Sequence, residues 1–183
     1  MLTVLNKIYI ILIYKWVEYI ESLVNFFIGL FHGVSKDVVI FIISLMPILE
    51  LRGGLLAATL LKVPYLRALV ICVIGNVLPI PFVLLFLEII FKWMEKWSVT
   101  KKIVKWLEKK GNSKRSQIDK YGYLGLILFV GIPLPGTGAW TGSLVAILLG
   151  LDKKKSFICI LIGVMLAAAI MSILSYGILG NLI

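Results

Sequence analysis

The sequence predicts an all-α integral membrane protein with two inverted repeats, each a re-entrant helical hairpin followed by a spanning helix. Of its 183 residues, 61% are hydrophobic and only 15% are charged, with a mean hydropathy of +1.05. Residues 68–87 and 156–183 carry no charge, and each stretch is long enough to cross a hydrocarbon core of about 30 Å. Two other apolar stretches are broken by proline and glycine. This composition excludes a soluble enzyme and a nucleic-acid-binding protein.

The first element is a helix over residues 3–31. Lys15, Glu18, Ser22 and Asn25 recur at helical spacing and form a polar stripe on one face. Such a helix either lies at the membrane interface or spans the membrane with its stripe against the bundle. We favour spanning. The charges also interrupt the apolar run, so the segment does not read as a cleavable signal peptide.

The first repeat is predicted over residues 37–91. Residues 37–61 form an apolar segment broken at "MPILELRGG" (46–54), which we interpret as a hairpin entering from the outside. Residues 66–91 form the spanning helix that follows, and this helix contains Pro79 and Pro81.

A basic connector follows over residues 92–120, with ten Lys and Arg against three acids. Basic loops stay on the cytoplasmic side, so we place the connector inside. Trp93, Trp97, Val104 and Leu107 share one helical face, which favours an amphipathic helix on the inner leaflet. The alternatives are a helix packed on other loops and a basic arm for nucleic acid.

The second repeat is predicted over residues 121–183, as a hairpin over 121–151 and a spanning helix over 156–180. Residues 121–151 carry no charge but contain "PLPGTGAW" (133–140), and each half alone is too short to cross the bilayer. Lys120 precedes this segment and Lys153–Lys155 follow it. Both flanks are basic, so both lie inside, as a re-entrant hairpin requires.

The two repeats are related by a shift of 88 residues, which places Pro47 on Pro135, Gly54 on Gly142 and Gly75 on Gly163. Hairpins that enter from opposite faces form an inverted repeat. In transporters with this architecture the substrate site lies near the midplane, where the broken helices meet.

Glu50 and Arg52 are the charges that carry most information, because they lie between two long uncharged runs. A charged residue within the membrane is costly and is usually functional. Arg52 can bind a phosphate or carboxylate, and Glu50 can exchange a proton. The neighbouring Gly53 and Gly54 complete this part of the predicted substrate site. Two alternatives stay open: a structural Glu–Arg pair that fixes the turn, and a turn near the outer surface.

The second break supplies the other half of the predicted site. A half-helix begins after Pro135, its free N–H groups attract anions, and Thr137 can cap it. Glycines there allow close backbone approach, and Trp140 can line the cavity. The full set in this half is Pro133, Pro135, Gly136, Thr137, Gly138, Trp140 and Gly142. No residue spacing predicts a metal, a cofactor, a nucleotide or a catalytic nucleophile, so we expect no enzyme.

"PILELRGGLLAA" (47–58) together with "PLPGTGAWTGSLVAILLGL" (133–151) resembles the small multidrug export protein family of prokaryotic membrane proteins. That family is similar to the DedA superfamily, which also has two re-entrant hairpins in inverted repeats. The resemblance covers roughly residues 36–180 and implies a multi-pass protein of the cytoplasmic membrane. Two departures occur. Leu55 and Leu56 stand where a small residue and a proline are expected, and Thr137 stands where DedA proteins have a glutamate.

The sequence thus predicts a transporter or flippase for a small amphipathic, anionic substrate, such as a polyprenyl-phosphate-like lipid. The first alternative is proton-coupled export of cationic drugs, with Glu50 as the proton carrier. The second is a structural or regulatory membrane protein that does not transport. Expected partners are membrane lipids and the substrate, and small-residue pairs such as Gly163 and Ala167 are compatible with a homo-oligomer.

Overall fold

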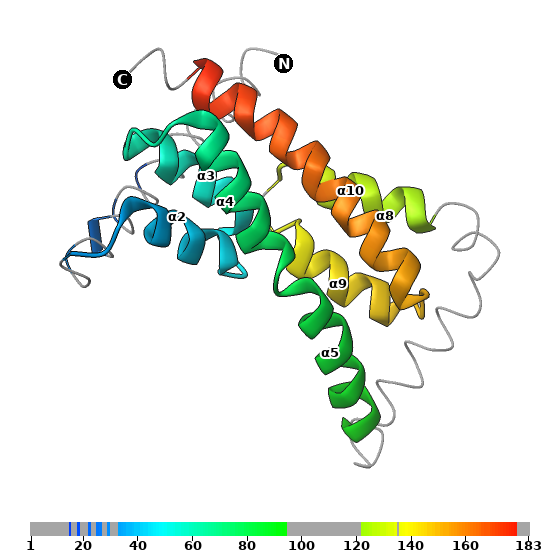
Figure 1. Ribbon diagram of the computed structural model, residues 1–183. Coiled ribbons are helices and arrows are strands. Elements are labelled where there is room, and N and C mark those ends of the chain that lie inside the picture. The colour runs from blue at the N-terminus through cyan, green and yellow to red at the C-terminus, as the bar shows by residue number, and fades with distance from the viewer. Residues whose placement is uncertain are drawn as a thin grey trace.

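The computed structural model describes residues 33–94, 122–134 and 136–178, with six isolated positions between residues 15 and 29. Every secondary-structure element in these ranges is a helix (Figure 1). The helix predicted over 3–31, apart from those six positions, lies outside the described residues. So do nearly all of the connector predicted over 92–120, and Pro135.

The first unit consists of two short helices, α2 (Lys36–Leu45) and α3 (Glu50–Leu60), followed by α4 (Tyr65–Val77). Helix α2 ends because Met46 precedes Pro47, and the proline ring pushes Met46 into an extended conformation (φ −70°, ψ 137°). The helix resumes at Glu50, so the observed break covers 46–49 and is shorter than the predicted 46–54. The two glycines of the motif belong to α3.

The sequence predicts one helix over 66–91, whereas the structure has two, α4 and α5 (Ile80–Met94), separated at residues 78 and 79. Pro79 and Pro81 have no backbone N–H, so two hydrogen bonds of a continuous helix cannot form at this point. Residues 65–86 are still long and apolar enough to cross a membrane, with a mean hydropathy of 2.6. The prolines divide the span without ending it.

The second unit repeats this order with α8 (Tyr123–Gly131), α9 (Ala139–Leu148) and α10 (Lys153–Ser172), which continues into the π-helical η2 (Ile173–Ile178). Helix α8 ends before Pro133, with Ile132 extended (φ −78°, ψ 120°). Helix α10 starts at Asp152, whose carboxylate accepts a hydrogen bond of 2.9 Å from the Lys155 N–H. Residues 153–177 form the second apolar stretch long enough to span, with a mean hydropathy of 2.9.

The ends of α3 and α9 have the same geometry, 88 residues apart. After α3, Lys62 adopts a left-handed conformation (φ 54°), its N–H donates to Thr59 O, and the Val63 N–H donates to Ala58 O. After α9, Gly150 is also left-handed (φ 65°); its N–H donates to Ile147 O, and the Leu151 N–H donates to Ala146 O, each 88 residues after its counterpart. Both ends are Schellman motifs, in which a left-handed residue lets the last free carbonyls be satisfied.

The glycines of the two units also make matching contacts. In the first unit a Cβ on Gly75 would lie 2.9 Å from the backbone oxygen of Phe41 and 3.0 Å from Ser44 Cβ, so α4 packs closely on α2. In the second unit a Cβ on Gly163 would lie 2.9 Å from the backbone oxygen of Ile127 and 2.7 Å from Val130 Cβ, so α10 packs on α8 in the same way.

The first arms of the two units, which are the short helices α2 and α8, therefore correspond at a shift of 86 residues, because Phe41 matches Ile127 and Ser44 matches Val130. The second arms, which are the short helices α3 and α9, keep the shift of 88 residues. The second unit therefore has two additional residues between its two short helices in this alignment. The sequence alignment of Pro47 with Pro135 is corrected accordingly: Pro47 matches Pro133, and each proline ends a first arm.

The long helices α4–α5 and α10 run in opposite directions, as Figure 1 shows. The start of α4 lies beside the end of α10: the rings of Tyr65 and Tyr176 meet edge to face at 5.3 Å, and the Tyr176 hydroxyl donates to Val63 O at 2.8 Å. The short helices of the two units lie at different ends of this pair (Figure 1).

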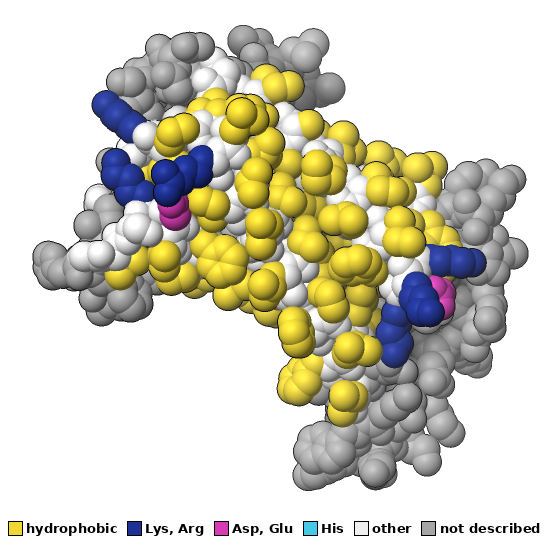
Figure 2. Space-filling model, in the orientation of Figure 1, with side chains coloured by type: hydrophobic (Ala, Val, Ile, Leu, Met, Phe, Trp, Pro, Cys, Tyr) yellow, Lys and Arg dark blue, Asp and Glu magenta, His cyan; other side chains and the backbone are white. Residues whose placement is uncertain are grey.

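Charged side chains gather at two ends of the visible face, with a broad apolar belt between them (Figure 2). At one end Arg67 pairs with Asp37, and Lys36 donates to Leu61 O. At the other end are Asp152 and the lysines that begin α10. Large apolar side chains are exposed along the belt, including Val70, Phe82, Leu85, Phe86, Ile158 and Ile162. An apolar belt of this kind is suited to contact with lipid.

The buried residues form two clusters, each centred on the short helices of one unit and completed by residues of the long helices. The first includes Ile40, Ile43, Leu55 and Cys72, and also takes in Ala167 and Met171 near the end of α10. The second includes Ile80, Leu126, Val130, Ala146, Ile160 and Val164. Helix α10 contributes to both clusters, so it joins the units, and the two breaks meet where the clusters adjoin.

Candidate functional site

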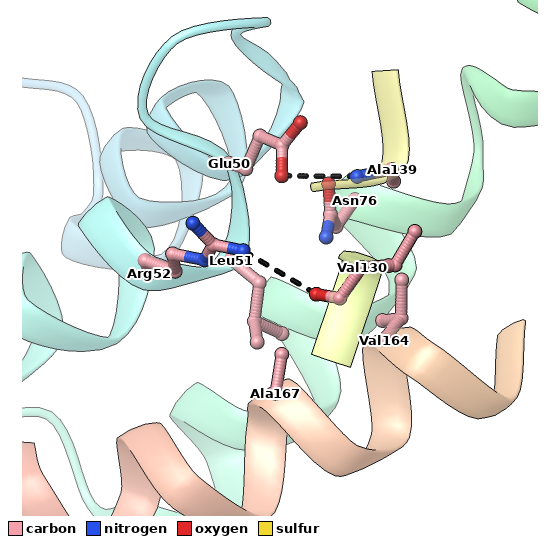
Figure 3. A pocket seen from close by; sticks show the side chains of 8 residues that line it. All are labelled: Glu50, Leu51, Arg52, Asn76, Val130, Ala139, Val164 and Ala167. Carbon is pink, nitrogen blue, oxygen red and sulfur yellow. Dashed lines mark hydrogen bonds between the residues drawn. The ribbon is translucent and has the colours of Figure 1, made fainter. Parts of the chain in front are cut away.

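Glu50 begins α3 and reaches the first turn of α9 in the other unit. Its side chain is 4% exposed. Its carboxylate accepts hydrogen bonds from the backbone N–H groups of Ala139 and Trp140, each at 3.1 Å (Figure 3 shows the first). The first N–H groups of a helix have no partner within the helix, and its N-terminus favours negative charge. Glu50 therefore serves as the N-terminal cap of a helix that lies 89 residues away in the chain.

Arg52, two residues later, binds the opposite arm of the second break. Its guanidinium donates to the backbone oxygens of Val130 (3.3 Å), Ile132 (3.2 Å) and Leu134. These oxygens lie at and just after the C-terminus of α8, where carbonyls lack helical partners and favour a cation. The planar guanidinium has five donors, so one side chain can satisfy several carbonyls together.

Glu50 and Arg52 therefore bind two different helix ends, and each caps one arm of the second break. Hydrogen bonds to a charged group contribute about 1.5–3 kcal/mol each when they are shielded from water. Glu50 also has a left-handed backbone (φ 52°), which costs a non-glycine residue about 1–2 kcal/mol. We call the Glu50 and Arg52 side chains with these partners the latch, because they join the first unit to the second.

The latch lies along a narrow crevice where the two buried clusters adjoin. Its lining residues come from α3, α4, α8, α9 and α10, and are Glu50, Leu51, Arg52, Asn76, Val130, Ala139, Val164 and Ala167 (Figure 3). The crevice is too narrow to admit a water molecule. In this conformation the site is closed, and its charges are bound by the protein itself.

Asn76 is the one polar residue among the eight that line the crevice that the sequence did not single out for the site. It lies on α4, is 2% exposed, and its side-chain oxygen has no hydrogen-bond partner within the described part of the chain. A buried amide oxygen without a partner is costly. In the sequence, Asn76 is a lone amide inside an apolar stretch, a pattern that by itself favours a hydrogen bond to a neighbouring helix. The structure gives this oxygen no such bond among the described residues.

Thr137 lies in the second break, but it does not cap α9 as the sequence suggested. The N-cap residue of α9 is Gly138, which has no side chain, and the carboxylate of Glu50 instead accepts hydrogen bonds from the first N–H groups of α9. The Thr137 hydroxyl instead accepts a 3.0 Å bond from Arg52 and lies 2.9 Å from Leu134 O. Thr137 therefore helps to hold Arg52 at the end of α8.

Gly138 is required by its backbone and by its neighbour. It has φ 149° and ψ −167°, a conformation essentially restricted to glycine. A Cβ at this position would lie 1.8 Å from Glu50 Oε2. Glu50 and Gly138 are themselves 88 residues apart, so equivalent positions of the two units face each other here.

The remaining predicted site residues are divided between the break and the packed helices. Pro133, Gly136 and Trp140 lie in or next to the break; Trp140 gives its backbone N–H to Glu50, while its indole nitrogen is buried and has no partner among the described residues. Gly53, Gly54 and Gly142 lie inside α3 and α9 against neighbouring side chains, for example Gly54 against Ser44 and Cys72. The structure brings these three into helix packing instead of into the crevice.

Two apolar helices of spanning length, together with a buried glutamate and a partly buried arginine at the junction of two similar helical units, define a helical membrane protein. The chain belongs to the family described as "Putative small multi-drug export protein", whose match covers residues 50–170, more than half of the 183 residues. The match begins at Glu50 and includes the whole second break. The family description indicates a membrane export protein. The chain matches no curated protein and no solved structure. The likeness to the DedA superfamily stays a prediction.

Proposed function

We propose that this protein moves a small amphipathic, anionic substrate across the membrane through the site that the latch closes. One observation carries the proposal: the N-terminus of α9, next to Arg52, already holds a carboxylate, that of Glu50. A phosphate or carboxylate head group offers the same acceptor oxygens to the same donors. A polyprenyl-phosphate-like lipid has such a head group and an apolar tail suited to the exposed belt.

In this proposal the two units are inverted repeats, and each pair of short helices is a re-entrant hairpin. The opposite directions of α4–α5 and α10, the charged groups at two ends of the molecule, and the matching contacts of the two units support it. The first hairpin enters from the outside and the second from the cytoplasm. Broken helices of transporters commonly meet near the midplane, and the proposal places the two breaks of this protein there.

Transport requires that the latch opens, because the crevice admits no water when it is closed. The anionic head group replaces Glu50 at the N-terminus of α9, and Arg52 turns from the carbonyls of α8 toward the anion. Substrate binding and latch opening then compete for the same donors. The donors of α9 and of Arg52 stay paired during this exchange, whereas the Glu50 carboxylate and the α8 carbonyls that they release need new partners, such as water in the opened crevice.

The test is a flipping assay in liposomes with a fluorescent anionic lipid. Arg52→Ala should lower the rate at least about tenfold, because it removes the guanidinium that binds the residues of the second break. Arg67→Ala is the matched control: it removes an arginine at the surface, 64% exposed, and should keep the rate. Equal rates for Arg52→Ala and the unaltered protein would refute the proposal.

A binding measurement on the unaltered protein covers the case in which Arg52→Ala does not fold. A ligand that binds only the folded protein raises its melting temperature. The polyprenyl phosphate should raise it in detergent, and the corresponding neutral alcohol should not. Equal stabilisation by both lipids would contradict binding through the head group.

A second function is favoured by the acidic side chain in the crevice and by the family description: proton-coupled export of cationic drugs. Glu50 would then exchange a proton for the drug. Overexpression should raise resistance to cationic compounds, and Glu50→Gln should abolish the effect. Unchanged tolerance to a panel of such compounds would count against it.

A third function, a structural or regulatory membrane protein, is favoured by the complete pairing of Glu50 and Arg52 with protein groups. It makes a different prediction. Deletion of residues 101–110 in the basic connector should abolish function, and Glu50→Gln should not.

A further inference from the structure

Asn76 and Glu50 enter the same crevice from different helices, α4 and α3 (Figure 3). Both side chains are almost fully buried, at 2% and 4% exposed. Glu50 is fully engaged with α9, whereas the side-chain oxygen of Asn76 has no partner among the described residues. The crevice thus contains an acceptor without a donor, next to a group that becomes a donor when it binds a proton.

We propose that Asn76 is the acceptor for protonated Glu50 and so couples proton binding to the opening of the latch. The proposal rests on the proposed transport site and adds a residue to it. A proton from the aqueous phase binds one carboxylate oxygen of Glu50, and the group becomes a neutral carboxylic acid. Its new O–H donates to Asn76 Oδ1, which satisfies the amide oxygen.

The same step weakens the latch. The N–H groups of Ala139 and Trp140 lose a charged acceptor, and bonds to a neutral acceptor are roughly half as strong. These donors at the N-terminus of α9 then become available to an anionic head group. Protonation of Glu50 therefore favours anion binding at the same site, with Arg52 supplying the remaining positive charge.

Among the described residues that line the crevice, Glu50 is the one acid that can take this proton. Arg52 is the one other titratable group among its eight lining residues. Of the helices packed on α3, α4 carries Cys72, which lies against Gly54 one turn further along α3. Helix α2 carries Lys36 and Asp37, and η2 carries Tyr176; these side chains bond to Leu61 O, Arg67 and Val63 O, respectively, at the charged end near the start of α4.

The test is infrared difference spectroscopy of the full-length protein in liposomes over a pH titration. The C=O band of protonated Glu50 is identified by its loss in Glu50→Gln. Asn76→Leu should move this band to higher frequency, because the carboxylic acid loses its acceptor. It should also lower the pH at which half of Glu50 is protonated, by about one unit for the loss of one hydrogen bond.

Ser172→Ala is the matched control, since it also removes a buried oxygen without a partner among the described residues, on α10 and outside the crevice lining. It should leave the band and the midpoint unchanged. An unchanged band in Asn76→Leu would overturn the proposal, and so would a band that follows the sodium concentration instead of pH.

A second measurement needs no substitution at position 76. In the protein labelled with ¹³C-asparagine, an amide C=O band should shift on acidification, and the shift should be absent from Glu50→Gln. If neither occurs, the proposal fails. Neither measurement uses a transported substrate, so failure here and failure of the flipping assay are distinguishable.

Discussion

Replacement of Gly138 by alanine tests whether the latch holds the two units together. Alanine would have to adopt φ 149°, ψ −167°, at a cost of about 1–3 kcal/mol. Its Cβ would also lie 1.8 Å from Glu50 Oε2, so the carboxylate must leave. Two charge-assisted bonds are then lost, each worth about 1.5–3 kcal/mol. The total is at least about 4 kcal/mol, or roughly a thousandfold in the folded-to-unfolded ratio.

The assay is reversible unfolding in a mild detergent, followed by circular dichroism. Gly136→Ala is the control from the same break: its φ of 79° is also unfavourable for alanine, but no atom lies within 4 Å of the added Cβ. It should cost only about 1–2 kcal/mol of backbone strain. The reasoning is refuted if both variants are equally stable.

A double-mutant cycle separates the two costs of Gly138→Ala, which are the backbone strain of alanine and the loss of the hydrogen bonds of Glu50. In a Glu50→Ala background the clash is absent and the bonds are already lost. Gly138→Ala should then cost only its backbone strain, about 1–3 kcal/mol. An unchanged cost in that background would show that the carboxylate is not the cause.

Three further substitutions follow from the same contacts. Arg52→Lys should lose about 1–2 kcal/mol of unfolding free energy, measured by denaturant titration, because one ammonium cannot satisfy the carbonyls that the guanidinium binds. Gly163→Ala should lower the free energy of unfolding by about 1–3 kcal/mol, because the added Cβ would lie 2.9 Å from the backbone of α8. Its control is Gly125→Ala, which should not lower the free energy of unfolding in the same titration, because no atom lies within 4 Å of the added Cβ. Arg67→Ala should change the free energy of unfolding by less than about 1 kcal/mol, since the ion pair of Arg67 with Asp37 is at the surface.

The sequence was sufficient for the order of the elements, because prolines and glycines act locally. Pro47 and Pro133 force the preceding residue out of the helical conformation, and this effect depends on no distant contact. Uninterrupted apolar runs likewise specify the long helices. The exact extent of each break was less predictable. Gly53 and Gly54 look like part of a loop, but their lack of side chains serves close packing of α3.

The site residues Glu50 and Arg52 were predicted because charges in apolar surroundings are rare. Their partners could not be predicted, since these are backbone groups of another unit, and a backbone group has no signature in the sequence. Asn76 was assigned to helix packing for the same reason. Asn76 lines the crevice because of how α4 lies against α3, α8 and α9, and only the assembled fold determines that arrangement.

The latch also has a consequence for how the chain is made. Glu50 and Arg52 are synthesised 78–90 residues before the groups that satisfy them. At about 5–20 residues per second, this leaves roughly 4–18 s in which the first unit carries two uncapped charges next to the insertion machinery. We therefore expect the first unit to reach its final arrangement only after the second has been synthesised, so that the two halves of the chain complete their folding together.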